Sequence, residues 1–513
     1  MATRTISDAG GNWNSTSTWI EGIIPTASDD VVATPTSGPL SSNSVTNSCL
    51  SLDLTNYTRT LTITSALYVY GDITLGSSST IGGTTYLYIR ANSNITSNGV
   101  TIPYLRFVGS DVVTINLIDD LHVGTQFYLS TGTSGAITAI TINNNNIYCY
   151  GGFFYEGFSR LFGTANLIMA GTGNLYGNNQ FGEIYNPVII DSPSGTITII
   201  GEMNIATSLT YISGTIVMGS GGIGTYLTMR GTGTKTIDFS PVAVWTYIRL
   251  YSVTASLLTD LYTNDLILES PVLNSSSISV YGNLTSINSQ GTTEIVIAGS
   301  GSWSSNASFY VLRNDLTINT TGSFTITGSS NSTMNYYGGK ITYISGTVIQ
   351  PTTLNIFGST TFDTSGMTFN NLNIRDGSMT LSSSLNATTM SLGYNASGVQ
   401  VTFTGSAGFN TNVLSINSSI YPSYINLTPG TTYNVNNNLI SSASAGNSIT
   451  FRASSSIDRP YFNLALAGSQ NVKYTNATNI DSSGGQTIFS LGGTLINSLN
   501  WSNYPSNFFL LFE

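Results

Sequence analysis

The octapeptide TYISGTIV at Thr210–Val217 returns almost unchanged as TYISGTVI at Thr342–Ile349. A second block, MAGTGNL at Met169–Leu175, returns in similar form as IAGSGSW at Ile297–Trp303. Upstream, YLYIR at Tyr86–Arg90 matches a later YLTMR. Because the blocks keep their order and nearly the same offset, the chain contains an imperfect repeat of about 130–140 residues.

Short strand-like runs fill this repeat and alternate with turn residues, as at Leu67–Tyr70, Thr196–Ile200 and Phe324–Thr327. Each coil of a solenoid buries its inward face only against its neighbours, so loop insertions can change the repeat length without breaking the core. A propeller would keep a stricter blade length of about 40–50 residues. The pattern therefore predicts an all-β solenoid of stacked coils.

The composition supports strands and argues against helices and disorder. Only 7% of the residues are charged, against about a quarter in an average soluble domain. The lysines that commonly cover helix surfaces number three: Lys235, Lys340 and Lys473. Hydrophobic residues make up 40% of the chain, including 29 Tyr and 21 Phe, which is far more apolar surface than a disordered chain carries.

The charge pattern excludes several classes of function. The net charge is −10 and the single histidine is His122, so no basic face is available for a phosphate backbone, and no nucleic acid partner is expected. No stretch of 18 apolar residues occurs, so no membrane-spanning helix is expected. The opening MATRTISDAGGNW lacks the apolar core of a signal peptide and favours folding in the cytoplasm.

The two cysteines, Cys49 and Cys149, stand far apart, with no CxxC motif and no neighbouring histidine. This spacing indicates neither a zinc site nor a redox pair, and we expect buried free thiols. A disulfide between the two residues is the alternative that the sequence leaves open. No cofactor and no metal site are expected.

The N-terminal segment Gly11–Val32 has the pattern G-x-W-x4-T-W-x2-G-x2-P-x3-D-D-V-V. It resembles the N-terminal motif of right-handed parallel β-helix proteins of bacterial surfaces and bacteriophage virions. The segment Val472–Trp501 is similar to the closing coil of the same group. The residues that carry the resemblance are Gly11, Trp13, Thr18, Trp19, Gly22, Pro25, Asp29, Asp30, Val32 and Trp501.

The resemblance implies a right-handed parallel β-helix with terminal caps, since a solenoid must cover its first open coil. We expect a cap and first coils over residues 1–60, a repetitive body over 61–470, and a closing coil with an apolar tail over 471–513. Asn143–Asn146 and Asn436–Asn438 are expected to form ladders at turns, because stacked coils place like residues above one another.

The most enzyme-like cluster is LIDDLHV, with Asp119, Asp120 and His122. A carboxylate beside a histidine could act on a polysaccharide as acid and base. Strand alternation would place Asp120 and His122 on one face and Asp119 on the other, so two of the three groups could converge. We expect a structural role for these three residues and no catalysis.

The adjacent acids Asp29 and Asp30 could bind calcium through their carboxylate oxygens, but we expect them to serve the N-terminal cap.

The chain ends in a run of apolar residues: Phe508, Phe509, Leu510, Leu511 and Phe512. This run is too apolar to stay exposed, and it is expected to dock on the last coil or on a partner.

The family resemblance favours a structural or adhesive role as a virion component, such as a head or tail fibre, spike or decoration protein. Its partners would be other virion or surface proteins and a glycan receptor. Self-association is expected, with a trimer favoured by analogy. The alternatives are a bacterial surface adhesin and a polysaccharide-degrading β-helix enzyme.

Overall fold

The computed structural model of the chain is nearly all β, with strands over 64% of the residues and no α-helix in the described part. One 3-10 turn, η1 (Thr16–Thr18), interrupts the strands near the N-terminus. The structure describes residues 1–44, 47–109, 112–131, 139–156, 160–177, 183–218, 226–230, 234–238, 244–251, 253–258, 260–269, 271–274, 276–281, 284–286, 290–291, 293–304, 314–327, 333–337, 339–349, 353–393, 400–418, 421–444, 446–455 and 458–504.

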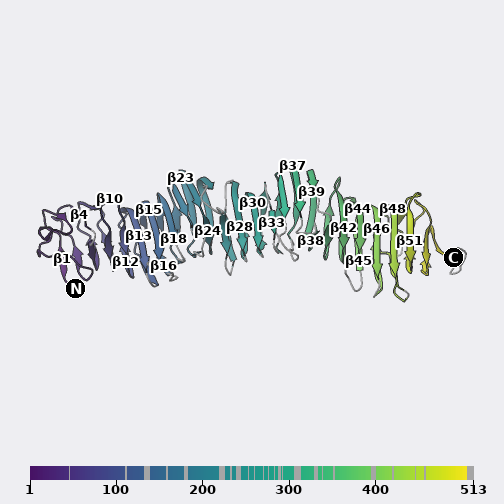
Figure 1. Cartoon of the computed structure of the whole chain (residues 1–513), viewed down its shortest axis with the longest axis horizontal. Coiled ribbons are helices and arrows are strands. Elements are labelled where there is room, and N and C mark those ends of the chain that lie inside the picture. Colours follow the sequence, from purple (N-terminus) through teal and green to yellow (C-terminus); the bar gives the residue numbers. More distant parts are fainter. Residues whose placement is uncertain are drawn as a thin grey trace. The chain divides into compact units, whose positions relative to one another are not determined.

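The chain divides into two compact units, Met1–Leu261 and Tyr262–Glu513. Within each unit the strands lie side by side as successive rungs, and all strand ladders in the described part are parallel (Figure 1). Two parallel strands start at the same end of the sheet. The chain must therefore make a full turn, or coil, between one strand of a stack and the next. The predicted parallel β-solenoid is therefore confirmed.

The first unit contains three stacks of strands. The first stack runs through β1 (Thr3–Thr5), β3 (Asp30–Val32), β6 (Ser51–Leu54), β9 (Ile73–Leu75), β12 (Ser93–Thr96), β14 (Val113–Leu117), β16 (Ala139–Asn144), β19 (Arg160–Phe162), β22 (Glu183–Ile184), β24 (Glu202–Ile205), β26 (Tyr226–Arg230) and β28 (Val244–Tyr251). A short stack holds β2 (Gly11–Asn12), β4 (Leu40–Ser42), β7 (Thr60–Ile63) and β10 (Thr80–Gly83).

The second stack of this unit contains thirteen strands in the described part of the chain. It runs through β5 (Asn47–Cys49), β8 (Leu67–Val69), β11 (Leu87–Ile89), β13 (Thr101–Gly109), β15 (Leu121–Thr131), β17 (Ile147–Cys149), β18 (Gly152–Glu156), β20 (Leu167–Met169), β21 (Gly173–Tyr176), β23 (Val188–Ile200), β25 (Leu209–Met218), β27 (Thr234–Asp238) and β29 (Thr254–Leu257).

The second unit contains two long stacks and one short pair. One stack has β30 (Leu261–Glu269), β32 (Ser277–Val280), β33 (Leu284–Ser286), β35 (Glu294–Ile297), β36 (Gly301–Ser304), β37 (Leu316–Thr327), β39 (Gly339–Ile349), β41 (Thr360–Asp363), β43 (Gly377–Leu381), β45 (Gln400–Gly405), β47 (Ser423–Leu427), β49 (Ile449–Ala453), β52 (Thr475–Thr478) and β54 (Leu495–Ile496). The other has β38 (Thr333–Tyr336), β40 (Thr353–Ile356), β42 (Thr368–Ile374), β44 (Leu385–Leu392), β46 (Phe409–Ser418), β48 (Thr432–Ala443), β50 (Tyr461–Leu464), β51 (Ser469–Lys473), β53 (Ile488–Leu491) and β55 (Trp501–Tyr504). The pair joins β31 (Val272–Asn274) and β34 (Gln290–Gly291).

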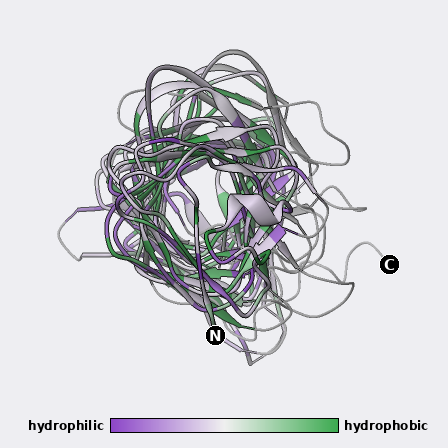
Figure 2. Ribbon diagram, turned by 90° about the vertical axis from the view of Figure 1, so that its left-hand side faces the viewer, coloured by the Kyte–Doolittle hydropathy of each residue, from purple (hydrophilic) through white to green (hydrophobic). Residues whose placement is uncertain are grey.

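The core is built from apolar residues that lie directly above one another on successive rungs. In the second stack, one inward column is fully buried and consists of Leu67, Leu87, Leu105, Phe127, Phe153 and Leu175. Strand alternation turns every second side chain inward, so apolar and polar positions follow each other along the coils (Figure 2). Each such column stabilises the fold by about 25 cal/mol for every Å² of apolar surface that it removes from water.

The two copies of the repeated octapeptide occupy equivalent bends. In β25 the Ser213 Oγ donates to Asp191 Oδ1 at 2.8 Å, and in β39 the Ser345 Oγ donates to Asn319 Oδ1 at 3.1 Å. Each bond crosses to the preceding rung at a point where the strand register shifts. The duplication found in the sequence therefore has a structural counterpart in each unit.

Asparagine ladders run along the outer faces. The longest passes from Asn386 through Asn410 and Asn434 to Asn463, with amide hydrogen bonds of 3.0, 2.8 and 3.2 Å between neighbours. Asn143 also forms a ladder, through Asn116 and Asn94. Asn143 lies within β16, but Asn146 lies in the turn between β16 and β17, where its Oδ1 accepts from Asn166 Nδ2 at 2.8 Å, so a ladder step stands at this turn as predicted. Asn436–Asn438 instead lies within β48 and not at a turn.

Both cysteines are buried and free, in β5 and β17. Burial raises the pKa of the Cys49 thiol, and the nearby Asp30 charge raises it further. Burial alone raises the pKa of the Cys149 thiol. Both thiols are therefore protonated at neutral pH, as expected for inert core residues.

Candidate functional site

The N-terminal motif residues come together as the first coil of the solenoid. Trp13 and Trp19 are buried, and their rings meet edge to face with centroids 5.2 Å apart. The Trp19 indole donates from Nε1 to the Trp13 carbonyl at 2.8 Å. Gly22 adopts φ +65°, a conformation that favours glycine, and Pro25 is buried. These contacts agree with a cap role for the motif.

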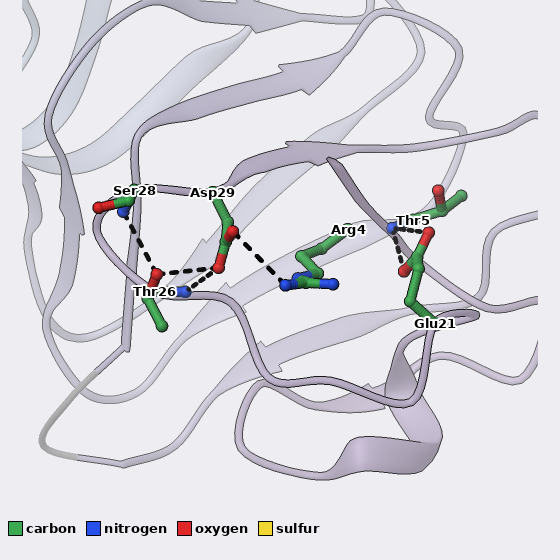
Figure 3. A network of polar contacts seen from close by, with 6 residues as sticks. All are labelled: Arg4, Thr5, Glu21, Thr26, Ser28 and Asp29. Atoms are coloured by element: carbon green, nitrogen blue, oxygen red, sulfur yellow. Dashed lines mark hydrogen bonds and ion pairs between the residues drawn. The ribbon is translucent and has the colours of Figure 1, made fainter. Parts of the chain in front are cut away.

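A polar network holds the strand β1 against this segment (Figure 3). Asp29 accepts hydrogen bonds from the Thr26 backbone N and from Thr26 Oγ1, both at 2.9 Å, and pairs with Arg4 at 3.5 Å. Glu21 accepts from the Thr5 backbone N at 2.9 Å. Asp30 has a separate partner, because its Oδ1 accepts from Ser51 Oγ at 2.6 Å. The two adjacent acids therefore serve different contacts.

The network predicts acid sensitivity of the cap. Burial raises the pKa of Asp29, but the Thr26 hydrogen bonds and the Arg4 charge outweigh it and hold that pKa below its usual value. A lowered pKa stabilises the fold above the ordinary value of about 3.9, and the stabilisation is lost as pH falls through the folded-state pKa. We expect Asp29→Asn to cost about 1–3 kcal/mol at pH 7, with the gap to the wild type closing below about pH 4. Thermal unfolding between pH 3 and pH 7 measures this, and a pH-independent gap would contradict it.

Trp501 lies in β55 and is buried against Phe451 and Phe462, with ring centroids 5.9 and 6.3 Å away. Its Nε1 donates to Ser482 Oγ at 2.7 Å. The side chain therefore fills the interior of the last described coils. Phe508–Phe512 falls outside the described residues, so docking of that run stays a prediction.

The acid and base groups predicted from the sequence, Asp119, Asp120 and His122, each have a different hydrogen-bond partner. Asp119 and Asp120 lie between β14 and β15, just before the strand that carries His122. Asp120 and His122 are both half-buried and flank the buried Leu121, but their polar atoms have different partners. Asp119 accepts from the Ser97 backbone N at 2.6 Å, and Asp120 accepts from the Asn146 backbone N at 2.8 Å. These carboxylates tie turns of neighbouring coils together.

His122 faces outward from β15, half-buried, and stacks against two tyrosines of the next rung. Its ring centroid lies 5.0 Å from that of Tyr148 and 5.9 Å from that of Tyr150. The His122 Nδ1 is 3.1 Å from the Tyr150 hydroxyl. This aromatic environment suits a surface contact better than proton transfer with a carboxylate.

We expect His122→Ala and Asp120→Asn to leave polysaccharide turnover at the background rate of the wild type. The physical reason is that the two groups have separate hydrogen-bond partners and share none. Release of reducing ends from a panel of bacterial polysaccharides measures it. Turnover by the wild type that either variant abolishes would restore the enzyme hypothesis.

The same face of the first unit carries a longer aromatic feature, which we call the outer column. Six side chains in register on consecutive rungs of the second stack form it: Tyr68, Tyr88, Arg106, Tyr128, Phe154 and Tyr176. All six are half-buried, and they alternate with the fully buried inward column. The rungs of a sheet are about 4.8 Å apart, which is close enough for neighbouring rings to stack.

The contacts along the outer column are continuous. Tyr68 and Tyr88 have ring centroids 4.8 Å apart, Tyr128 and Phe154 are stacked at 6.0 Å, and Phe154 and Tyr176 are stacked at 5.8 Å. The Arg106 guanidinium carbon lies 4.3 Å from the Tyr128 ring centroid and 5.6 Å from that of Tyr88. The arginine thus replaces a ring in the stack by cation–π contact.

Two neighbours widen this surface. The exposed Arg90 places its guanidinium carbon 4.6 Å from the Tyr68 ring centroid. Tyr86 packs edge to face against Tyr88 at 5.9 Å and Tyr104 at 5.7 Å, and its hydroxyl donates to Gln126. The face therefore offers rings, hydroxyl groups and two guanidinium groups together.

Sequence reasoning used Tyr86–Arg90 as part of the repeat but missed the outer column. A signal was present, because apolar residues flank its members in LYV, LYI, LRF and FYL, at Leu67–Val69, Leu87–Ile89, Leu105–Phe107 and Phe127–Leu129. The intervals between successive members of the outer column are unequal along the chain, which hides the periodicity until the strand registers are known.

No family model, curated protein or solved structure matches this chain. Among the described residues, no group of three or more His, Cys, Asp or Glu side chains is arranged to hold a metal ion. The same part of the chain has no helix of the length and hydrophobicity needed to cross a membrane.

Proposed function

We propose that this chain is a structural and adhesive β-solenoid of a bacteriophage virion, acting in a head or tail fibre, spike or decoration protein. The observation that carries the adhesive part is the outer column, an aromatic and cationic surface displayed by a rigid stack of rungs. The resemblance of the N-terminal motif to β-helix proteins of virions and bacterial surfaces supports the placement. A solenoid is suited to this role because its stacked coils present one extended surface.

The decisive experiment is the composition of purified phage particles from the organism that encodes the chain. We expect the protein in those particles at a fixed ratio to the capsid protein, and antibody labelling at one defined position under the electron microscope. Labelling of the bacterial envelope in cells that make no particles would instead show a surface adhesin, which could use the same outer column. Absence from both places would contradict the proposal.

Assembly through the C-terminal run is part of this proposal, with a trimer as the expected state. Burying three Phe and two Leu could contribute several kcal/mol per subunit at about 25 cal/mol per Å². Deleting residues 507–513 is expected to abolish self-association while the β-type circular dichroism signal is kept. Analytical ultracentrifugation measures it. Unchanged assembly with a lower melting temperature would show that the run is a cap on its own coil.

A further inference from the structure

The arginines of the first unit differ in their contacts, and Arg249 combines an ion pair to Glu202 with a cation–π contact to Tyr251. Arg4 and Arg160 pair with acids, at 3.5 Å from Asp29 and 3.3 Å from Glu183. Arg90 and Arg106 lie instead on tyrosine rings, and neither forms an ion pair in the part of the chain that the structure describes. Two guanidinium groups without acidic partners among the described residues therefore lie on one face of a chain whose net charge is −10.

The orientation of Arg106 leaves it able to bind. Its Nε donates to Ser130 Oγ at 3.0 Å, which fixes the guanidinium between the rings of Tyr88 and Tyr128. The same guanidinium group has further N–H donors on its two terminal nitrogens. Arginine presents such donors in a planar fork that matches a carboxylate. Stacking and the Ser130 bond therefore orient the fork before any ligand arrives.

From this geometry we propose that the outer column and Arg90 form a binding site for an acidic polysaccharide. Because the ring faces of the outer column pack on one another, the outward edges of the rings would contact the C–H groups of successive sugar units, and Arg90 and Arg106 would bind their carboxylates. The tyrosine hydroxyls supply hydrogen-bond partners for sugar hydroxyls. The spacing of rungs, about 4.8 Å, is close to the length that one sugar unit adds to an extended glycan.

A second copy of this chain fits the surface less well. The centre of a protein interface is enriched in apolar groups and depleted of charge, whereas this face combines arginines with tyrosine hydroxyls. An anionic, hydroxyl-rich ligand complements both features. The inference deepens the proposed attachment function and rests on it for its biological meaning, although the binding chemistry can be tested on the purified chain alone.

The test uses oligosaccharides of alginate, polygalacturonate and hyaluronate as probes, each beside its carboxyl-reduced neutral form. Calorimetry with the full-length chain is expected to show binding of at least one acidic probe that weakens with added salt. The neutral form should bind at least about tenfold more weakly, because the carboxylate bonds are lost. Binding of no acidic probe, or equal binding of both forms, overturns the proposal.

Variants locate the site. Arg106→Ala is expected to weaken binding of the acidic probe about tenfold or more, and Arg90→Gln, at an exposed position, should weaken it severalfold. Arg452→Ala is the matched control, because Arg452 lies 4.6 Å over the Tyr424 ring in the second unit and donates to Asn426. It should leave binding unchanged. Equal loss in all three variants, or no loss in the first two, contradicts the assignment.

Two further measurements keep the outcomes distinct. If Arg106→Ala lowers the melting temperature, Arg90→Gln decides the result, since its side chain is exposed. If sedimentation shows that Arg90→Gln changes the oligomeric state and leaves glycan binding intact, the face is a contact between copies and the proposal fails. Particle composition tests the virion role separately, so either idea can fail without the other.

Discussion

Replacing Trp13 with alanine is expected to destabilise the first coils by about 3–5 kcal/mol, the usual cost of removing a fully buried tryptophan. The variant loses the edge-to-face contact with Trp19 and leaves a cavity beneath the start of the stack. The Trp13 Nε1 is buried without a hydrogen-bond partner, so removing it costs no hydrogen bond, which favours the lower half of the range. Hydrogen exchange of the amides in β1, β3 and β6 measures the opening free energy directly.

Ile20→Ala is the matched control for that prediction, since Ile20 lies beside Trp19 but is 63% exposed. A surface substitution of this kind usually changes stability by less than about 0.5 kcal/mol. A solenoid couples each coil chiefly to its neighbours, so exchange in the second unit should be unaffected in both variants. Similar loss of protection in the two variants would show that the tryptophan pair is not the source of the cap's stability.

Gly83→Ala is expected to cost about 2–4 kcal/mol, combining backbone strain with displacement of a neighbouring rung. Gly83 ends β10 at φ +115°, a conformation that L residues rarely adopt. A Cβ there would lie 2.0 Å from the carbonyl oxygen of Ile63 on the rung below, so the backbone itself must move. Thermal and denaturant unfolding of the purified variant measure the effect.

Gly82 provides a control one residue away. A Cβ on Gly82 would meet only Thr60 Cγ2, at 3.7 Å, which is ordinary contact. Gly82→Ala should therefore be neutral or stabilise by up to about 1 kcal/mol, because alanine restricts the unfolded chain. Equal destabilisation by both substitutions would contradict the close approach of the coils at Gly83.

Much of the fold could be predicted because solenoid packing is local. The repeat of TYISGTIV and the apolar alternation in strands such as Leu67–Val69 both follow from the need of each coil to bury one face. The contact between Trp13 and Trp19 was also within reach of the sequence, since it joins residues only six positions apart. The candidate site could not be predicted in this way, because the residues of the outer column belong to six different coils.

The sequence by itself determined that this protein is a β-solenoid with a duplicated segment, because composition, alternation and repeat order each depend on residues close in the chain. Only the tertiary structure decided which outward residues meet. Coil length varies, so a shift of one residue would turn Tyr88 or Arg106 inward and break the outer column. It also decided the partners of the acid and base groups, because Asp120 accepts from the Asn146 backbone and His122 meets the Tyr150 hydroxyl, both on the next coil.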